Sequence, residues 1–391
     1  MSPEMVVFIN WSREFVMKKI SIFGATGTIG KKAGEIAALN NFEIIAITGN
    51  SNHEELIRQA KLYNPKYVCV TDNDGYKIVR DSLSGFETEV LDGSELKSIA
   101  NLEVDVCVMA ISGVSGLAPT FECLGRAKRL AIATKEAIIC GGDLLINEAK
   151  VKNTEIIPVD SEHSSLFQCL AHENKNDINK LIITASGGPF LNLEESELAN
   201  VSLAETLRHP NWTMGKKITV DSATMINKAL EIIEASYLFD IPINKIEPLI
   251  HPESIIHGMA FFNDGSFKAS LSAPDMFLPI SYAINYPDRK PCFMKGLDFS
   301  ELGQLSFQKP KSWQKRNMNL AYESRQESKV IAFNIANEYA VDLFLREKIK
   351  FTDIYTTIMK TIEKSPNEQT KSLGDIVNII SDIKNQLLTI Y

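Results

Sequence analysis

The sequence is poor in cysteine, and its cysteines are not clustered as a metal site or a disulfide framework would require. Only six are spread over 391 residues, and no two form a C-x-x-C pair. This spacing excludes a zinc ribbon and a disulfide-rich secreted scaffold. We therefore expect reduced, mostly buried thiols at Cys69, Cys107, Cys123, Cys140, Cys169 and Cys292.

Long apolar runs and an excess of basic residues are also missing. No stretch approaches the roughly 20 apolar residues of a transmembrane helix, so we expect a cytoplasmic protein without a membrane partner. The chain has 41 Lys and Arg against 49 Asp and Glu, which gives a net charge of −8. Because a net acidic chain binds polyanions poorly, nucleic acid is excluded as the main partner. A small anionic substrate stays compatible, since a pocket needs only a few local cations.

The composition is that of an ordinary globular protein, with 45% hydrophobic and 23% charged residues and a length sufficient for two or three domains. The first sixteen residues fit this pattern poorly. Val6–Ile9 is a short apolar run, Glu4 and Glu14 flank it, and no small-residue cleavage site follows, so a signal peptide is a poor match. Met17 is an alternative start, and we assign no function to residues 1–16.

From Lys19 onward, short apolar strands alternate with helical stretches, a pattern typical of an α/β protein with a doubly wound parallel sheet. The predicted strands are Ile20–Phe23, Phe42–Ile47, Tyr67–Val70, Val106–Ala110, Leu130–Ala133 and Ile156–Val159. We predict a Rossmann-like domain over 17–159, an α+β catalytic domain over 160–288, a proline-containing linker over 289–313 and a helical domain over 314–391.

The glycine-rich segment Gly24–Gly30 lies between the first strand and the first helix, where backbone N–H groups and the helix dipole can hold a pyrophosphate. The alternative is a tight turn that needs glycine for steric reasons alone. After the second strand, Gly49–Asn52 contains no acid to bind a ribose 2′-hydroxyl, and this favours NADPH over NADH. The lack of an Arg or Lys there weakens this preference and leaves Ser51, Asn52 and backbone amides as the expected phosphate ligands.

Two acidic segments predict a site for a divalent cation. Asp160 and Glu162 follow a predicted strand, and at a period of two they would point to the same side. In a helix begun near Ser222, Asn227 and Glu231 are i, i+4 neighbours, and Glu231 supplies a third carboxylate. The alternatives are a solvated D-x-E triplet and a helix whose Lys and Glu side chains face solvent. Glu234 is read as either a supporting acid or a surface residue.

Two further segments are candidates for a phosphate-binding turn and for a mobile lid. Ser186 begins an S-G-G-P turn that offers a hydroxyl and flexible backbone. The segment His209–Gly215 places Trp212 between proline and glycine, so we predict a lid over about 206–216 that buries Trp212 only when substrate is present. The alternative is a tryptophan packed permanently against its own domain.

Together these segments resemble the 1-deoxy-D-xylulose 5-phosphate reductoisomerase family over nearly the whole chain. The resemblance rests on G-A-T-G-T-I-G at 24–30, A-T-K-E at 133–136, P-V-D-S-E-H at 158–163, S-G-G-P-F at 186–190, H-P-N-W-T-M-G at 209–215, V-D-S-A-T-M-I-N-K-A-L-E at 220–231 and N-I-A-N-E at 334–338. It implies NADPH-dependent conversion of a sugar phosphate, 1-deoxy-D-xylulose 5-phosphate, to 2-C-methyl-D-erythritol 4-phosphate in non-mevalonate isoprenoid synthesis, by a homodimer.

The resemblance also implies roles for individual residues. Metal ligands for Mn²⁺ or Mg²⁺, with Co²⁺ as a further candidate, would be Asp160, Glu162 and Glu231. Catalytic residues would be Lys135, Glu162, His209 and Glu231, and substrate contacts would come from Lys135, Ser161, Glu162, Ser186, His209, Trp212, Ser222, Asn227, Lys228 and Glu231. Cofactor contacts would come from Thr26, Gly27, Thr28, Ile29, Gly49, Asn50, Ser51, Asn52, Thr134, Glu136 and Gly215.

Three positions depart from the pattern of that family. Thr134 stands for an asparagine, Ser51 for a basic residue, and Phe277-Leu278 for Arg-Thr. The first two affect expected cofactor contacts and leave the reaction class unchanged. Two other functions compete: a semialdehyde dehydrogenase would need a catalytic cysteine in a motif that is missing here, and a non-enzymatic NADPH sensor would have no use for the carboxylates.

Overall fold

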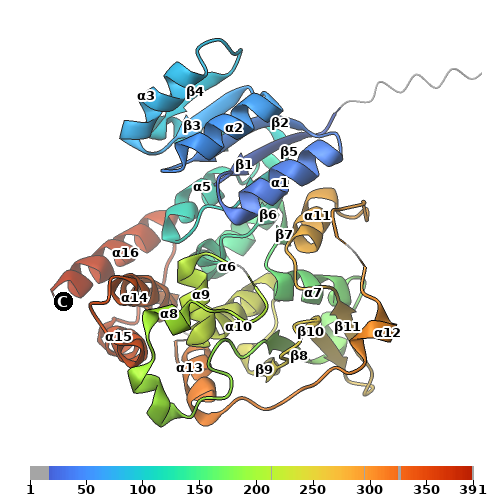
Figure 1. The fold of residues 1–391 in the computed structure, drawn as a ribbon, viewed down its shortest axis with the longest axis vertical. Helices are drawn as coiled ribbons and strands as arrows, with labels where there is room; N and C mark the ends of the chain where they lie inside the picture. The colour runs from blue at the N-terminus through green and yellow to red at the C-terminus, as the bar shows by residue number, and fades with distance from the viewer. Residues whose placement is uncertain (1–16, 213, 295, 325–326, 390–391) are drawn as a thin grey trace, which may run out of the picture.

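A computed structural model describes residues 17–212, 214–294, 296–324 and 327–389 (Figure 1). The expectation for residues 1–16 lies outside these ranges. The first half of the chain builds a seven-stranded parallel sheet with the strand order β4-β3-β2-β1-β5-β6-β7. Its strands are β1 (Lys19–Phe23), β2 (Glu43–Gly49), β3 (Tyr67–Val70), β4 (Glu89–Asp92), β5 (Val104–Met109), β6 (Ala127–Ile132) and β7 (Glu155–Pro158). The predicted doubly wound parallel sheet is therefore confirmed.

The sequence analysis missed β4, which lies at the edge of this sheet. β4 has only four residues, with acids at both ends, and such short charged segments are common at sheet edges because they discourage pairing with other chains. The helices of this half are α1 (Thr28–Leu39), α2 (His53–Tyr63), α3 (Asn73–Ser82), α4 (Leu96–Ala100), α5 (Leu117–Glu122) and α6 (Lys135–Val151).

A second, four-stranded sheet has the order β11-β10-β8-β9, in which only β8 and β9 are parallel. Its strands are β8 (Ile178–Ala185), β9 (Ile246–Ile250), β10 (Ile256–Phe262) and β11 (Phe267–Leu271). The helices of this region are α7 (Ser161–Leu170), α8 (Leu203–Thr206), α9 (Lys216–Ala223), α10 (Ile226–Phe239), α11 (Phe277–Asn285) and α12 (Phe299–Leu302). α11 returns to the first sheet and packs against α1.

The C-terminal part is helical, as expected from its isoleucine pattern. It contains α13 (Ser312–Glu323), α14 (Glu327–Leu345), α15 (Phe351–Lys364) and α16 (Leu373–Leu388). Residues of α14 enter two hydrophobic cores, one shared with α10 and β8 and the other with the first sheet. Figure 1 shows α14 beside α15 and α16, at the left of the view and below the first sheet. Short 3₁₀ turns span Gly93–Glu95, Val114–Gly116, Lys175–Asp177, Glu195–Asn200 and Ile243–Lys245.

The structure also bears on the cysteines and on membrane-spanning helices. In the described residues all six cysteines are free thiols; five are buried, and Cys292 is half-buried. Within the same residues, no helix combines the length and the apolar character that a membrane crossing demands.

The glycine-rich turn shows which of its glycines are needed for packing. Gly24 has φ of +77°, and a Cβ there would lie 2.4 Å from the carbonyl oxygen of Ala110. A Cβ on Gly30 would lie 2.3 Å from the carbonyl oxygen of Gly24. By contrast, a Cβ on Gly27 would lie at an ordinary 3.5 Å from that same oxygen. The steric interpretation is thus right for Gly24 and Gly30, while Gly27 leaves open space at the start of α1.

This difference predicts unequal effects of alanine. Gly30→Ala should lower the melting temperature of the protein without ligands by about 5 °C, because the new methyl group overlaps rigid backbone. Gly27→Ala, the matched control, should change it by less than about 2 °C. Differential scanning calorimetry of both variants checks this, and equal losses would contradict it.

Candidate active site

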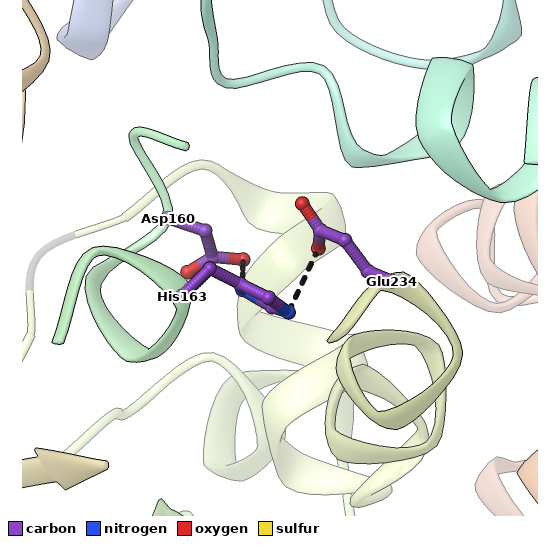
Figure 2. A group of neighbouring side chains, drawn as sticks. All are labelled: Asp160, His163 and Glu234. Carbon is purple, nitrogen blue, oxygen red and sulfur yellow. Dashed lines mark ion pairs between the residues drawn. The ribbon is translucent and has the colours of Figure 1, made fainter. Parts of the chain in front are cut away.

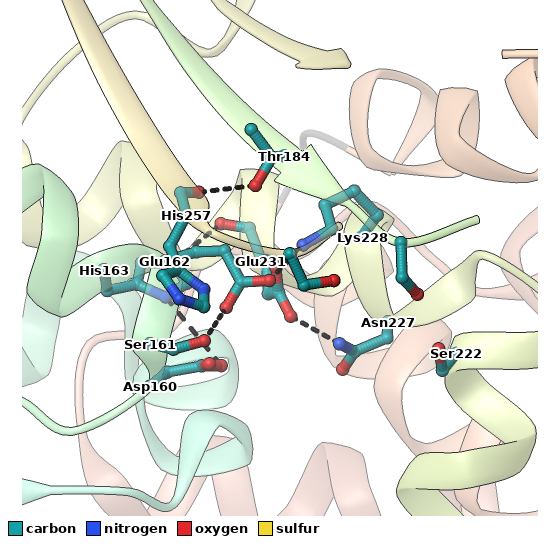
Figure 3. A network of polar contacts seen from close by, with 12 residues as sticks. Asp160, Ser161, Glu162, His163, Thr184, Ser222, Asn227, Lys228, Glu231 and His257 are labelled. Carbon is teal, nitrogen blue, oxygen red and sulfur yellow. Dashed lines mark hydrogen bonds and ion pairs between the residues drawn. The ribbon is translucent and has the colours of Figure 1, made fainter. Parts of the chain in front are cut away.

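The carboxylates singled out in the sequence meet beside a cavity of about 680 Å³ (Figure 3). Asp160, Glu162 and Glu231 each offer an oxygen within 4.8 Å of the others. The expected strand geometry was wrong: β7 ends at Pro158, and Asp160 and Glu162 lie at and just after the start of α7. A helix start brings them together because the first turn curls both side chains toward the cavity.

Glu231 comes from α10, and the expected start of that helix was also wrong. Met225 has φ of +61° and separates α9 from α10, so Ser222 lies near the end of α9 and α10 begins at Ile226. The i, i+4 relation holds, since Asn227 Nδ2 donates a hydrogen bond to Glu231 Oε1. Glu231 is only 1% exposed, so the solvent-facing alternative for this helix is wrong.

Two buried lysines balance these acids. Lys135 Nζ, at the start of α6, lies 2.7 Å from Asp160 Oδ2 and donates to Asn227 Oδ1 at 2.8 Å. Lys228 Nζ lies 2.6 Å from Glu162 Oε1 and also pairs with Glu231. Burial opposes the charge on both lysines, but the facing carboxylates outweigh it and raise both pKa values.

The electrostatics of the acids fit a divalent cation. Burial, reinforced by the Glu162 carboxylate, raises the pKa of Glu231 to about 7 despite the two lysines. Asp160 Oδ2 is buried, and in the described residues the closest cation to it is the Lys135 ammonium at 2.7 Å. A cluster short of positive charge, with hard oxygen ligands from three residues, is the donor set that Mg²⁺ or Mn²⁺ prefers.

His163 and Glu234 form a second group next to Asp160 (Figure 2). His163 is fully buried, with Nδ1 3.8 Å from Asp160 Oδ2 and Nε2 3.6 Å from Glu234 Oε2. Its Nε2 also lies 3.0 Å from the carbonyl oxygen of Glu231, so the ring spans the two helices that carry the acids. Glu234 is 1% exposed, and burial raises its pKa to about 8. The surface alternative for Glu234 is therefore wrong.

A histidine and two serines form the part of the site suited to a phosphate. His209 Nε2 lies 3.2 Å from Ser186 Oγ and 3.1 Å from Ser222 Oγ. His209 Nδ1 accepts hydrogen bonds from the backbone N–H groups of Asn211 and Trp212. Because burial lowers the pKa of His209 to about 4, the ring is neutral at pH 7, and the proton must be on Nε2, facing the serines.

Described residues of the predicted lid line the cavity beside this group. Trp212 is half-buried, and its ring meets that of His257 at a centroid distance of 6.1 Å. Asn211 Nδ2 donates to the carbonyl oxygen of Pro252 and to Ser254 Oγ. Thr213 lies outside the described residues. A half-buried ring at the cavity wall is compatible with a lid, whose movement stays a prediction.

The cofactor residues expected from the sequence are only partly gathered in the cavity. Those that line it are Gly27, Thr28, Ile29, Thr134, Glu136 and Gly215, whereas Thr26 is not part of its wall. Thr134 is buried, and its hydroxyl donates to the carbonyl oxygens of Met109 and Ile111. Gly49–Asn52 do not line the cavity; Asn50, Ser51 and Asn52 are exposed at the end of β2.

The sequence analysis missed several residues of the cavity wall, among them His257, Lys217, Asp221 and Glu338. His257 lies on β10, is nearly buried, and burial lowers its pKa. A single histidine in an apolar strand carries no sequence signal of a site. Asp221 and Glu338 lie inside quoted motifs and Lys217 adjoins one, but no role was assigned to them, because that role depends on how α9 and α14 pack.

Comparisons with known proteins agree with this site. Family models described as 1-deoxy-D-xylulose 5-phosphate reductoisomerase match residues 20–142, and models of its C-terminal domains match 156–239 and 271–386. Proteins named 1-deoxy-D-xylulose 5-phosphate reductoisomerase match from Caldanaerobacter subterraneus, 43% identical over 96% of this chain and 100% of the relative, and from Wolbachia pipientis, 44% identical over 93% and 95%.

Solved structures of reductoisomerases also match this chain. A reductoisomerase in complex with NADPH, fosmidomycin and magnesium superposes with a TM-score of 0.90 at 36% identity, covering 95% of this chain and 98% of the other. The Zymomonas mobilis enzyme in complex with NADPH gives 0.89 at 36% identity, with 96% and 99% covered. Full-length identity well above 30%, together with the matching fold, means that the chain belongs to the 1-deoxy-D-xylulose 5-phosphate reductoisomerase family.

Proposed function

We propose that this chain is an NADPH-dependent reductoisomerase that converts 1-deoxy-D-xylulose 5-phosphate to 2-C-methyl-D-erythritol 4-phosphate. The observation that carries the proposal is the convergence of Asp160, Glu162 and Glu231 beside a phosphate-type group and a glycine turn, in one cavity. Related proteins carry this name, and their solved structures hold NADPH and magnesium.

The three carboxylates would hold a divalent cation, which supplies Lewis-acid polarisation of a ketone and the neighbouring hydroxyl during the rearrangement, and NADPH supplies the hydride that follows. Lys228 reaches Glu162 and Glu231, so it keeps these acids in place and offers a cation close to the substrate. Lys135 does the same for Asp160. Both lysines cost less to bury because the acids face them.

The substrate phosphate would be bound by the hydroxyls of Ser186 and Ser222, the Nε2 proton of His209, and the side chains of Asn227 and Lys228. A neutral histidine donates one directed hydrogen bond, and the lysine contributes the charge. The backbone N–H of Trp212 donates to His209 Nδ1. The Trp212 ring would cover the bound substrate and exclude water. Binding at the phosphate thereby helps to assemble the site around the reacting carbons.

The proposal is tested by following NADPH absorbance with 1-deoxy-D-xylulose 5-phosphate, with and without Mn²⁺, and with NADH in parallel. We expect consumption of NADPH that depends on the metal. No consumption by a folded, NADPH-binding protein would contradict the proposal and favour a cofactor sensor. A homodimer in the cytoplasm is also proposed, supported by the family resemblance, and light scattering after size-exclusion chromatography tests the dimer.

Glu231→Gln should lower turnover by about a hundredfold or more and weaken Mn²⁺ binding, because one of three anionic ligands is lost. NADPH affinity should stay within about twofold. Mn²⁺ binding is measured by electron paramagnetic resonance, and Glu247→Gln, an exposed acid on β9, is the control. Normal turnover of Glu231→Gln at saturating metal would show that Glu231 is not a metal ligand.

Trp212→Ala should lower turnover by at least about tenfold while changing the melting temperature of the protein without ligands by less than about 2 °C, because the ring is only half-buried. Trp313 is 1% exposed and donates to the carbonyl oxygen of Leu193, so Trp313→Ala is the matched control and should destabilise strongly. A large loss of melting temperature in Trp212→Ala would favour the permanently packed tryptophan.

The lowered pKa of His209 predicts a pH dependence of stability. Below the ordinary histidine pKa of about 6.5, the unfolded chain binds a proton that the folded His209 does not take up until about pH 4. This residue therefore costs stability progressively as the pH falls from about 6.5 to about 4. His209→Gln should show a smaller loss of melting temperature across that window than the parent protein, and identical losses would contradict the assignment.

A further inference from the structure

Helix α14 carries polar side chains into the interior, and the proposed function uses none of them. Asn334 and Asn337 are fully buried, and Glu338 is largely buried at the cavity wall. These residues belong to the N-I-A-N-E segment that the sequence analysis singled out. Buried polar groups are costly unless they are partnered, so each of them calls for a partner.

Asn337 finds its partner in the helix that follows the lid. Its Nδ2 donates to Asp221 Oδ1 at 2.8 Å, and Asp221 Oδ2 lies 2.9 Å from Lys217 Nζ. Lys217 Nζ in turn lies 3.0 Å from Glu136 Oε1 at the start of α6. This chain of contacts ties α14, α9 and α6 together, which accounts for Asn337 by packing alone.

Glu338 points elsewhere, toward the loop after β5. The backbone N–H of Val114 donates to Glu338 Oε1 at 3.0 Å, and Asn334 Nδ2 approaches the same oxygen at 3.5 Å. Gly113, with φ of +75°, has no side chain to separate the loop from this carboxylate; a Cβ there would lie 3.3 Å from Oε1. Within the described part of the chain, both hydrogen bonds to Glu338 end on Oε1, which leaves Oε2 for a ligand.

The position of Glu338 relative to the first sheet indicates which part of a ligand it would meet. It lines the same cavity as Gly27, Ser112, Gly113 and Glu136. β5 lies beside β1 on the side opposite β2, so the chain order reverses between β1 and β5. In doubly wound folds a dinucleotide crosses the sheet at this reversal, with its adenosine half beyond the strand that follows β1 and its nicotinamide half on the other side. Glu338, next to the loop after β5, is therefore on the side where the nicotinamide half would lie.

The chemistry of a largely buried carboxylate narrows the choice further. Burial raises the pKa of Glu338, Lys217 lowers it, and the nearby Glu136 carboxylate raises it again. Because Glu136 already places one acid beside Glu338, a further anion such as the pyrophosphate would be unfavourable there. A carboxylate accepts hydrogen bonds from neutral donors, and the nicotinamide half offers ribose hydroxyls and a carboxamide NH₂.

We propose that Glu338 of α14 is a cofactor-binding residue, which accepts a hydrogen bond from a hydroxyl or amide donor on the nicotinamide half of NADPH. The C-terminal helices thus complete the cofactor site of the first sheet. This inference rests on the proposed function, since it takes NADPH as the cofactor.

The test compares the binding of NADPH and of 2′,5′-ADP, which is the adenosine half alone, by isothermal titration calorimetry. Glu338→Ala should weaken NADPH binding about tenfold and change 2′,5′-ADP binding by less than about twofold. Glu338→Gln keeps an acceptor oxygen and should fall between Glu338→Ala and the parent protein. Glu323→Gln, an exposed acid at the end of α13, is the matched control and should bind NADPH normally.

The outcomes separate the two proposals. If Glu338→Ala binds NADPH as the parent protein does, or if both ligands weaken equally, Glu338 has only a structural role and the inference is wrong, while metal-dependent turnover by the parent protein would keep the proposed function. If the parent protein itself fails to bind NADPH, both proposals are overturned.

Discussion

The structure depends on the pairing of three carboxylates, one buried and two half-buried, with two buried lysines. Asp160, Glu162 and Glu231 would repel one another in a site of low dielectric constant if Lys135 and Lys228 did not face them. The five groups come from α6, α7 and α10, so the cluster exists only when these three helices are docked. Removing either lysine would leave the carboxylates further from charge balance, which ties the integrity of the site to the packing of the fold.

The two halves of the molecule contribute to the site in different ways. The parallel sheet provides two loops: the turn after β1 and the loop after β5 lie at the reversal of strand order, and residues of both line the cavity. The region around the second sheet provides side chains, and its segment from Ser186 to Asn227 gathers hydroxyls, a neutral histidine and an amide. A pyrophosphate suits the first surface and a sugar phosphate suits the second, so one cavity can bring a hydride donor and a substrate together.

The C-terminal helices connect these halves. α14 belongs to two hydrophobic cores and also reaches Asp221 on α9 and Val114 after β5. Because α9 follows directly on the predicted lid, the position of the lid is linked to the same packing. The C-terminal helices therefore do more than pack against the rest of the fold, because α14 contributes Glu338 to the cavity wall.

The sequence by itself determined the doubly wound sheet, the helical C-terminal part and the chemistry-bearing segments, because strand periodicity, glycine turns and acidic spacing are local properties. It misjudged local geometry where one residue decides it: Pro158 ends β7 before Asp160, and Met225 in a left-handed conformation divides α9 from α10. Only the tertiary structure decided that Glu234 is buried and that His257 and Glu338 face the cavity. These depend on contacts between segments far apart in the chain, which no local pattern records.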